Sequence, residues 1–126
     1  MALTFRQLSE RFMICRLTAD VPLPAWVPLG PFVSITRTHD EVSIVCPEQH
    51  PLPDVKCETG WVALRLEGPF PFSQTGILAS FLHPLAEGHI PVFAVSTFDT
   101  DYVLIKQENL EAALHALADA GHQLAR

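Results

Sequence analysis

The order of periodic segments in residues 61–126 constrains the fold of this chain most strongly. Two stretches there, about 74–87 and 107–120, carry apolar residues at helical spacing. Four shorter stretches with the composition of strands surround them: 61–67, 91–98, 101–106 and 122–125. The resulting order is β-α-β-β-α-β, in which two interlocked crossovers give a four-stranded antiparallel sheet with both helices on one face. We therefore predict an α+β, ferredoxin-like fold for this part of the chain.

Residues 1–60 contain segments typical of strands but little that can form a helix. The strand-like segments are 12–17, 32–38 and 41–46. The stretches 20–30 and 47–60 each carry three prolines. Each proline removes a backbone donor and restricts the residue before it. We therefore expect both proline-containing stretches to be loops.

The two parts of the chain also share a pattern. Residues 33–48, VSITRTHDEVSIVCPE, align without gaps on residues 93–108, FAVSTFDTDYVLIKQE. Apolar positions match, and the two predicted turns superpose, although any two amphipathic hairpins can align in this way. We interpret the pattern as a structural repeat. It predicts a degenerate unit over 1–60 that is reduced in helix, and a complete unit over 61–126.

Composition excludes several classes of partner. The chain has 8 Lys and Arg against 14 Asp and Glu, so no basic stripe is present to neutralise phosphates. We therefore expect neither nucleic acid nor an anionic membrane as a partner. No apolar stretch approaches the ~20 residues that span a bilayer. Residues 1–12 contain polar residues where a signal peptide would have its apolar core, so we do not expect one.

The cysteines bear on the compartment. There are three, Cys15, Cys46 and Cys57, an odd number without a CxxC pair. Cys15 and Cys46 lie in apolar runs, which is typical of small buried side chains. These observations agree with a cytoplasmic protein in which Cys15 and Cys46 are small buried side chains, and reactive or ligating thiols are the alternative.

The first predicted helix contains a proline in its apolar pattern. Pro84 has no amide hydrogen and cannot donate to the carbonyl of Ser80, four residues earlier. We expect the helix to be kinked or shortened there.

Several motifs in the second part resemble the ACT domain family. They include TGIL (75–78), HIPVFA (89–94) and the longer stretch EGPFPFSQTGILASFLHPLAEGHIPVFAVSTFDTDYVLI (67–105). The longer stretch is similar to small bacterial proteins with paired ACT-like units, and to the ACT modules of the animal cytosolic arginine sensors. The resemblance is strong over 61–126 and weak over 1–60. It implies binding of a small ligand, usually an amino acid, at the loop before the first helix, often across an interface. It also implies a regulatory role, which in most members serves an attached enzyme.

The loop that precedes the first predicted helix is the first candidate binding element. The first amides of a helix have no partner within it, and the helix dipole leaves partial positive charge there. A carboxylate can bind to these amides, and Gly76 would allow it to approach the backbone closely. Alternatively, Ser73 or Thr75 simply caps the helix while the neighbouring phenylalanines fill the core.

The predicted hairpin around Asp99 and Asp101 is the second candidate element. Aspartate is common in turns because its side chain bonds the nearby backbone, so both residues can be turn-formers. Alternatively, one of them binds the α-ammonium group of an amino acid. We expect the loop and the hairpin tip to lie at opposite ends of neighbouring strands, so that a second copy of the chain would complete the site. The predicted ligand-binding residues are Phe72, Ser73, Gln74, Thr75, Gly76, Ile77, Ser96, Thr97, Phe98, Asp99 and Asp101.

Catalysis is the less favoured interpretation. A strand followed by Asp-x-Asp also occurs in haloacid-dehalogenase-type phosphatases, but that chemistry needs a helical crossover, a lysine and further acids for magnesium. Here another strand follows at once, and Lys106 is the only lysine downstream. The histidines have no metal-ligand spacing and are expected in turns and on helix surfaces: His39, His50, His83, His89, His115 and His122.

We therefore predict a non-catalytic protein without cofactor or metal, which binds a free amino acid or a similar small zwitterion. A homodimer is expected, because open sheet faces and edges need cover. The alternative is a structural interaction module without a ligand, in which Phe70 and Phe72 fill the pocket.

Overall fold

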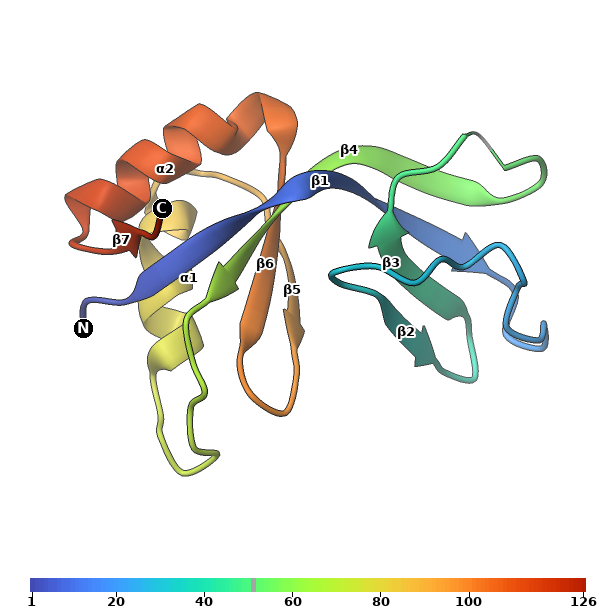
Figure 1. Ribbon diagram of the computed structural model, residues 1–126, viewed down its shortest axis with the longest axis horizontal. Coiled ribbons are helices and arrows are strands. Elements are labelled where there is room, and N and C mark those ends of the chain that lie inside the picture. The colour runs from blue at the N-terminus through green and yellow to red at the C-terminus, as the bar shows by residue number, and fades with distance from the viewer. Residues whose placement is uncertain (51) are drawn as a thin grey trace. The chain divides into compact units, whose positions relative to one another are not determined.

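A computed structural model describes residues 1–50 and 52–126, which form two compact units. We call Met1–Ser9 with Val62–Arg126 the ferredoxin-like unit, and Glu10–Trp61 the small unit. The elements follow in the order β1 (Thr4–Leu17), β2 (Ser34–Arg37), β3 (Val42–Pro47), β4 (Lys56–Leu66), α1 (Ile77–Glu87), β5 (Phe93–Ser96), β6 (Asp101–Lys106), a 3₁₀ turn (Gln107–Asn109), α2 (Leu110–Asp119) and β7 (Gln123–Leu124) (Figure 1). Strands β1 and β4 each contribute residues to both units.

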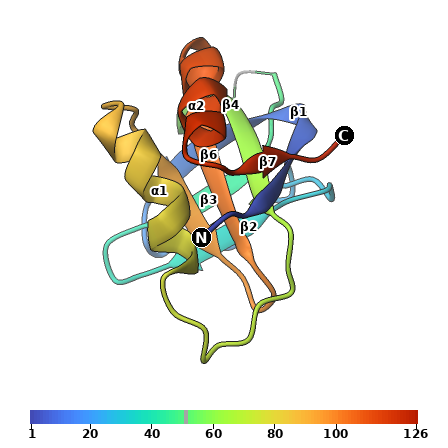
Figure 2. The same cartoon turned by 90° about the vertical axis from the view of Figure 1, so that its left-hand side faces the viewer.

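The ferredoxin-like unit has the predicted α+β architecture. Its strands lie in the order β1-β4-β6-β5, and β7 pairs with β1. Helices α1 and α2 cover the same face of this sheet (Figure 2). One connection differs from the prediction, because Thr4 and Phe5 of β1 pair in parallel with Gln123 and Leu124. The start of β1 thus lies between β4 and β7, and the first nine residues belong to this unit.

The core of this unit lies between the helices and the sheet. Phe5 of β1 packs edge-on against Phe81 of α1, with ring centroids 5.2 Å apart. Burying each large apolar side chain contributes roughly 1.5–3 kcal/mol, so the apolar stripe of α1 holds it on the sheet. The other buried members are Leu3, Val62, Leu64, Leu66, Ile77, Leu85, Val103, Ile105, Ala113 and Leu117.

Helix α1 continues through Pro84 to Glu87, so of the two expected effects of this proline, a kink or a shortened helix, the shortening does not occur. The carbonyl of Ser80, which Pro84 cannot reach as a donor, lies 3.1 Å from Nε2 of His122. The other ring nitrogen, Nδ1, accepts a hydrogen bond from the amide of Leu3 at 3.0 Å. That donor fixes the neutral tautomer with its proton on Nε2, which donates to Ser80. His122 is only 4% exposed, so its predicted surface position is wrong.

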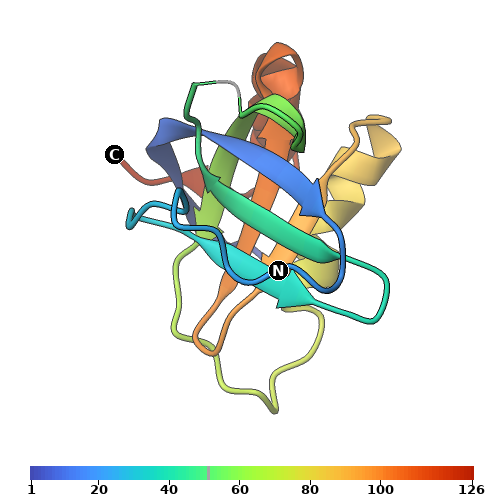
Figure 3. The ribbon, with the colours of Figure 1, turned by 90° about the vertical axis from the view of Figure 1, so that its right-hand side faces the viewer.

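The small unit consists of strands and loops. Strand β3 pairs antiparallel with β1, with Met13 opposite Cys46, and with β2, with Ile35 opposite Ile44 (Figure 3). The described residues of this unit contain no helix, and the proline-containing stretch 20–30 is a loop, as predicted. Its buried core includes Met13, Val42, Ile44 and Cys46.

Two features of the small unit differ from the expectations. Strand β4 begins at Lys56, inside the loop expected over 47–60, and Pro51 of that stretch lies outside the described residues. Cys15 and Cys57 form a disulfide, because β4 brings Cys57 beside β1. Cys46 stays free and buried, as expected, and burial raises the pKa of its thiol.

Candidate ligand-binding site

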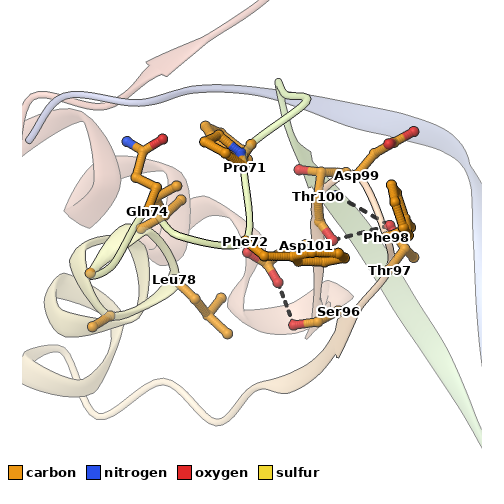
Figure 4. A pocket seen from close by; sticks show the side chains of 14 residues that line it. Pro71, Phe72, Gln74, Leu78, Ser96, Thr97, Phe98, Asp99, Thr100 and Asp101 are labelled. Atoms are coloured by element: carbon orange, nitrogen blue, oxygen red, sulfur yellow. Dashed lines mark hydrogen bonds between the residues drawn. The ribbon is translucent and has the colours of Figure 1, made fainter.

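The loop between β4 and α1 and the hairpin between β5 and β6 border one pocket of about 320 Å³ (Figure 4). The expectation that these two elements lie at opposite ends of the sheet is wrong. Helix α1 carries the chain back across the sheet, so β4 and β5 run in the same direction and end at the same edge (Figure 1). A second copy of the chain is therefore not required to bring the hairpin to the loop.

The pocket gathers most of the predicted residues. All of them except Ser73 and Thr75 line it, and those two side chains are exposed. Five further lining residues were not among the predicted ligand-binding residues: Phe70, Pro71, Leu78, Ala79 and Thr100. Leu78 could have been predicted as a pocket residue, because it follows Ile77 in the first turn of the apolar helix. Thr100 reaches the pocket only through the geometry of the hairpin, which local sequence does not indicate.

Hydrogen bonds join β4 and the loop that follows it to the hairpin. The amide of Phe70 donates to the carbonyl of Asp99 at 2.9 Å, and the hydroxyl of Thr100 donates to the carbonyl of Leu66 at 2.7 Å. Gly68 lies so close that a Cβ atom there would be 2.9 Å from the Asp99 carbonyl oxygen. A glycine is therefore required at this contact, and the pocket walls are held together without a ligand.

The start of α1 faces this pocket without a side-chain cap. Its N-cap residue is Gly76, with φ of 79°, a left-handed conformation that favours glycine. Throughout the described loop, neither Ser73 nor Thr75 caps the helix, so the alternative that they serve only as caps does not hold. No acidic side chain occupies the first turn. The first amides of α1 and the positive end of its dipole are consequently available to an anion.

A threonine pair, rather than the aspartates, closes the hairpin turn. The amide of Thr97 donates to the carbonyl of Thr100 at 2.8 Å, and the amide of Thr100 donates to the Thr97 hydroxyl at 3.2 Å. The carboxylate of Asp101 accepts a hydrogen bond from the Ser96 hydroxyl. The Asp99 carboxylate points away from that of Asp101 (Figure 4). The two carboxylates thus keep acceptor sites for other groups.

Two phenylalanines lie exposed at the pocket. Phe72 from the loop and Phe98 from the hairpin are 76% and 79% exposed, and their rings meet edge to face with centroids 4.8 Å apart. Phe72 therefore does not fill the core, as one alternative had it, whereas Phe70 does pack against the core. Exposed aromatic rings can pack on the side chain of a bound molecule.

The charges around the pocket suit a zwitterion. The lining contains two carboxylates, Asp99 and Asp101, and no lysine, arginine or histidine among the residues described for it. The positive counterpart is the uncapped start of α1. A molecule with one carboxylate and one ammonium group matches both. No cluster of metal-ligating side chains occurs within residues 1–50 and 52–126.

These features agree with the comparisons with known proteins. The chain belongs to the ACT domain family, whose model matches residues 56–119. A second family model, of an N-terminal domain, matches residues 10–52. The first matching region covers most of the ferredoxin-like unit after its first strand. The second covers most of the small unit.

Particular relatives are close in structure or sequence. A crystal structure of a protein from Agrobacterium tumefaciens is 42% identical, covers 99% of this chain and 93% of its own, and superposes with a TM-score of 0.92. The bovine "Cytosolic arginine sensor for mTORC1 subunit 1" is 30% identical over 98 residues, 69% of this chain. This chain spans only 30% of the length of that curated relative.

A third comparison shows the fold alone. The regulatory subunit of aspartate kinase from Thermus thermophilus is 13% identical, with a TM-score of 0.63 and coverage of 88% of this chain and 93% of its own. No helix in the described part of the chain is long and apolar enough to cross a membrane.

Proposed function

We propose that this protein is a non-catalytic regulatory protein that binds a free amino acid in the pocket between the β4–α1 loop and the β5–β6 hairpin. One observation carries the proposal: a helix start without a cap faces a carboxylate, Asp101, across a pocket whose described lining has no basic side chain. The ligand carboxylate binds the first amides of α1. Its ammonium group binds Asp101, which Ser96 already orients.

The remaining predicted residues have subsidiary roles in this proposal. Gly76 and Ile77 present the helix amides, and Phe72, Gln74 and Phe98 contact the ligand side chain. Ser73 and Thr75 lie outside the pocket and are left out of the proposed site. Thr97 keeps the hairpin closed through its bond to Thr100. Asp99 points away and has a different role, which is developed below.

The same geometry argues against catalysis by the aspartate pair. Asp101 is itself the first residue of β6, so the motif sits at the tip of a hairpin and not before a helical crossover. Phosphatase chemistry would need such a crossover and further acids around a metal.

We also propose how the rest of the chain is organised. The small unit is a degenerate second copy of the ACT-like unit, since it keeps the strands and loops of a reduced repeat. A homodimer forms through β5, which ends the strand order and leaves one backbone edge open. The protein acts in the cytoplasm, in line with the cytosolic arginine sensor to which it is similar. Thiol reductants in that compartment would act on the Cys15–Cys57 bond.

A melting-temperature screen against the twenty amino acids tests the function. A ligand at about 100 times its dissociation constant should add roughly 2.7 kcal/mol to the free energy of unfolding. Asp101→Asn should abolish the shift, while Asp119→Asn, a change at an exposed acid on α2, should leave it intact. If no amino acid shifts the transition at millimolar concentration, the chain is a structural module without this ligand, and the proposal is wrong.

A further inference from the structure

A second cavity lies on the other side of the β5–β6 hairpin, and we call it the rear cavity. It measures about 270 Å³ and shares only Thr97, Asp99 and Thr100 with the first pocket. Its remaining walls are Arg65, Leu66, Glu67, Gly68, Pro69 and Tyr102.

Strand alternation places the rear cavity on the face opposite the helices. Leu64, Leu66 and Val103 are buried in the core under α1 and α2. Successive side chains of a strand point to opposite faces, so Arg65 and Tyr102 project from the other side of the sheet. The rear cavity is thus a separate space with its own charged lining.

Arg65 provides a fixed positive charge in this cavity. Its Nη2 lies 3.2 Å from Oε1 of Glu67, and its side chain also bonds that of Tyr102. Glu67 accepts a second hydrogen bond, from Nε of Arg6 at 3.0 Å. Hydrogen bonds from Arg65 and Arg6 lower the pKa of Glu67, and the bond to Glu67 raises the pKa of Arg65. Two arginines share one carboxylate, so one positive charge is in excess.

Asp99 provides a negative charge in the same cavity. Its backbone carbonyl is bonded to Phe70, but its side chain has no partner among the described residues. The carboxylate points away from Asp101 and Ser96, which belong to the first pocket (Figure 4). Asp99 and Arg65 form no ion pair with each other, although both line the rear cavity. The cavity therefore carries three charged side chains: Arg65, its partner Glu67, and Asp99, which forms no ion pair with Arg65.

We propose that the rear cavity is a second binding site, for a small zwitterion whose carboxylate binds Arg65 and whose ammonium group binds Asp99. The described lining offers few apolar walls, chiefly Pro69 and the ring of Tyr102, so a molecule with a large apolar side chain would gain little there. Arginine offers several donors in a planar fork that suits a carboxylate. Both sites use the hairpin 97–100, and any effect of binding at one site on the affinity of the other would be reciprocal.

The test is a nuclear magnetic resonance titration of the full ¹⁵N-labelled chain with glycine, the smallest such zwitterion. Glycine should shift the signals of Arg65 Nε–H and the Gly68 amide, which report the rear cavity. Acetate and methylammonium each offer one of the two charges and should bind at least about tenfold more weakly, since each lacks one charge-assisted bond. If acetate binds as tightly as glycine, the cavity is an anion site and the zwitterion assignment is overturned.

Matched variants separate this site from the first pocket. Arg65→Gln and Asp99→Asn should abolish the shifts at Gly68 while leaving any ligand-induced shifts of the Leu78 and Ala79 amides, and Asp101→Asn should do the reverse. The two sites are followed through different amide signals. If the Leu78 and Ala79 signals do not shift with any amino acid, that result would count against the proposed function of the first pocket but not against the rear site. If the Gly68 amide does not respond to millimolar glycine, or responds equally in Arg65→Gln, the rear site does not exist.

Discussion

His122 replaces a hydrogen bond that Pro84 cannot make, and the His122→Phe variant measures what this replacement contributes. Phenylalanine keeps a ring near Phe81, whose centroid lies 5.5 Å from that of His122, but it removes both nitrogens. The buried amide of Leu3 and the partly buried carbonyl of Ser80 would both lose their partner. An unsatisfied buried group costs about 1–3 kcal/mol.

Two such groups give an expected loss of about 2–6 kcal/mol in the free energy of unfolding, and the melting temperature should fall by roughly 10 °C or more for a chain of this size. Urea denaturation followed by circular dichroism measures the first quantity, and calorimetry measures the second. His115→Phe is the matched control, since His115 is exposed on α2 and should tolerate the change. A loss below about 0.5 kcal/mol, the range of ordinary surface substitutions, would refute the role of His122.

The Pro84→Ala background isolates the part that concerns Ser80. Alanine at position 84 restores an amide that can donate to the Ser80 carbonyl within the helix. In this background His122→Phe should lower the free energy of unfolding by about 1 kcal/mol less than it does when Pro84 is present. That difference is the contribution of one hydrogen bond, the bond from His122 to Ser80. Equal costs in the two backgrounds would mean that His122 does not substitute for the missing amide, whatever its effect on stability.

Three further predictions concern other contacts. Gly68→Ala places a methyl group against the Asp99 carbonyl, so it should cost about 1–3 kcal/mol and abolish the amino-acid-induced shift in melting temperature. Glu67 has its pKa lowered by its two arginine partners, so its contribution is present above the unfolded pKa and is lost as pH falls through the folded pKa. Glu67→Gln should therefore destabilise by less than about 1 kcal/mol at neutral pH, and the difference should vanish in acid denaturation series. Reducing the Cys15–Cys57 bond, which closes a separation of 42 residues, should cost about 4 kcal/mol in urea unfolding, and a double serine variant should not respond to reductant.

The strand and helix pattern after residue 61 was predictable because its periodicity is strong and local. Helix α1 was placed near its true position, and β6 occupies 101–106, as predicted. What failed was the direction of strands, since the loop and the hairpin were expected at opposite ends. Strand direction follows from counting crossovers along the chain, and a helix between two strands makes them parallel.

Contacts between distant residues explain the other differences. The start of β1 was missed because, among residues 4–11, only Phe5 is buried, so these residues carry no alternating pattern. They form a strand because β7 and β4 supply backbone partners. His122 gave no signal for burial, because its partner Leu3 is 119 residues away. Likewise, nothing local to Cys15 or Cys57 indicates that β1 and β4 bring them together.

The parallel pairing of β1 with β7 has a consequence for the order in which the chain can fold during synthesis. Thr4 and Phe5 leave the ribosome early, but they pair with Gln123 and Leu124, and the amide of Leu3 binds His122. The residues of the small unit, by contrast, are all made within 10–61. Domains fold as units while the ribosome adds roughly 5–20 residues per second. The small unit can thus finish folding several seconds before the partners of the first nine residues are synthesised. During that interval Phe5 has no core to pack into, so its ring is available to a chaperone.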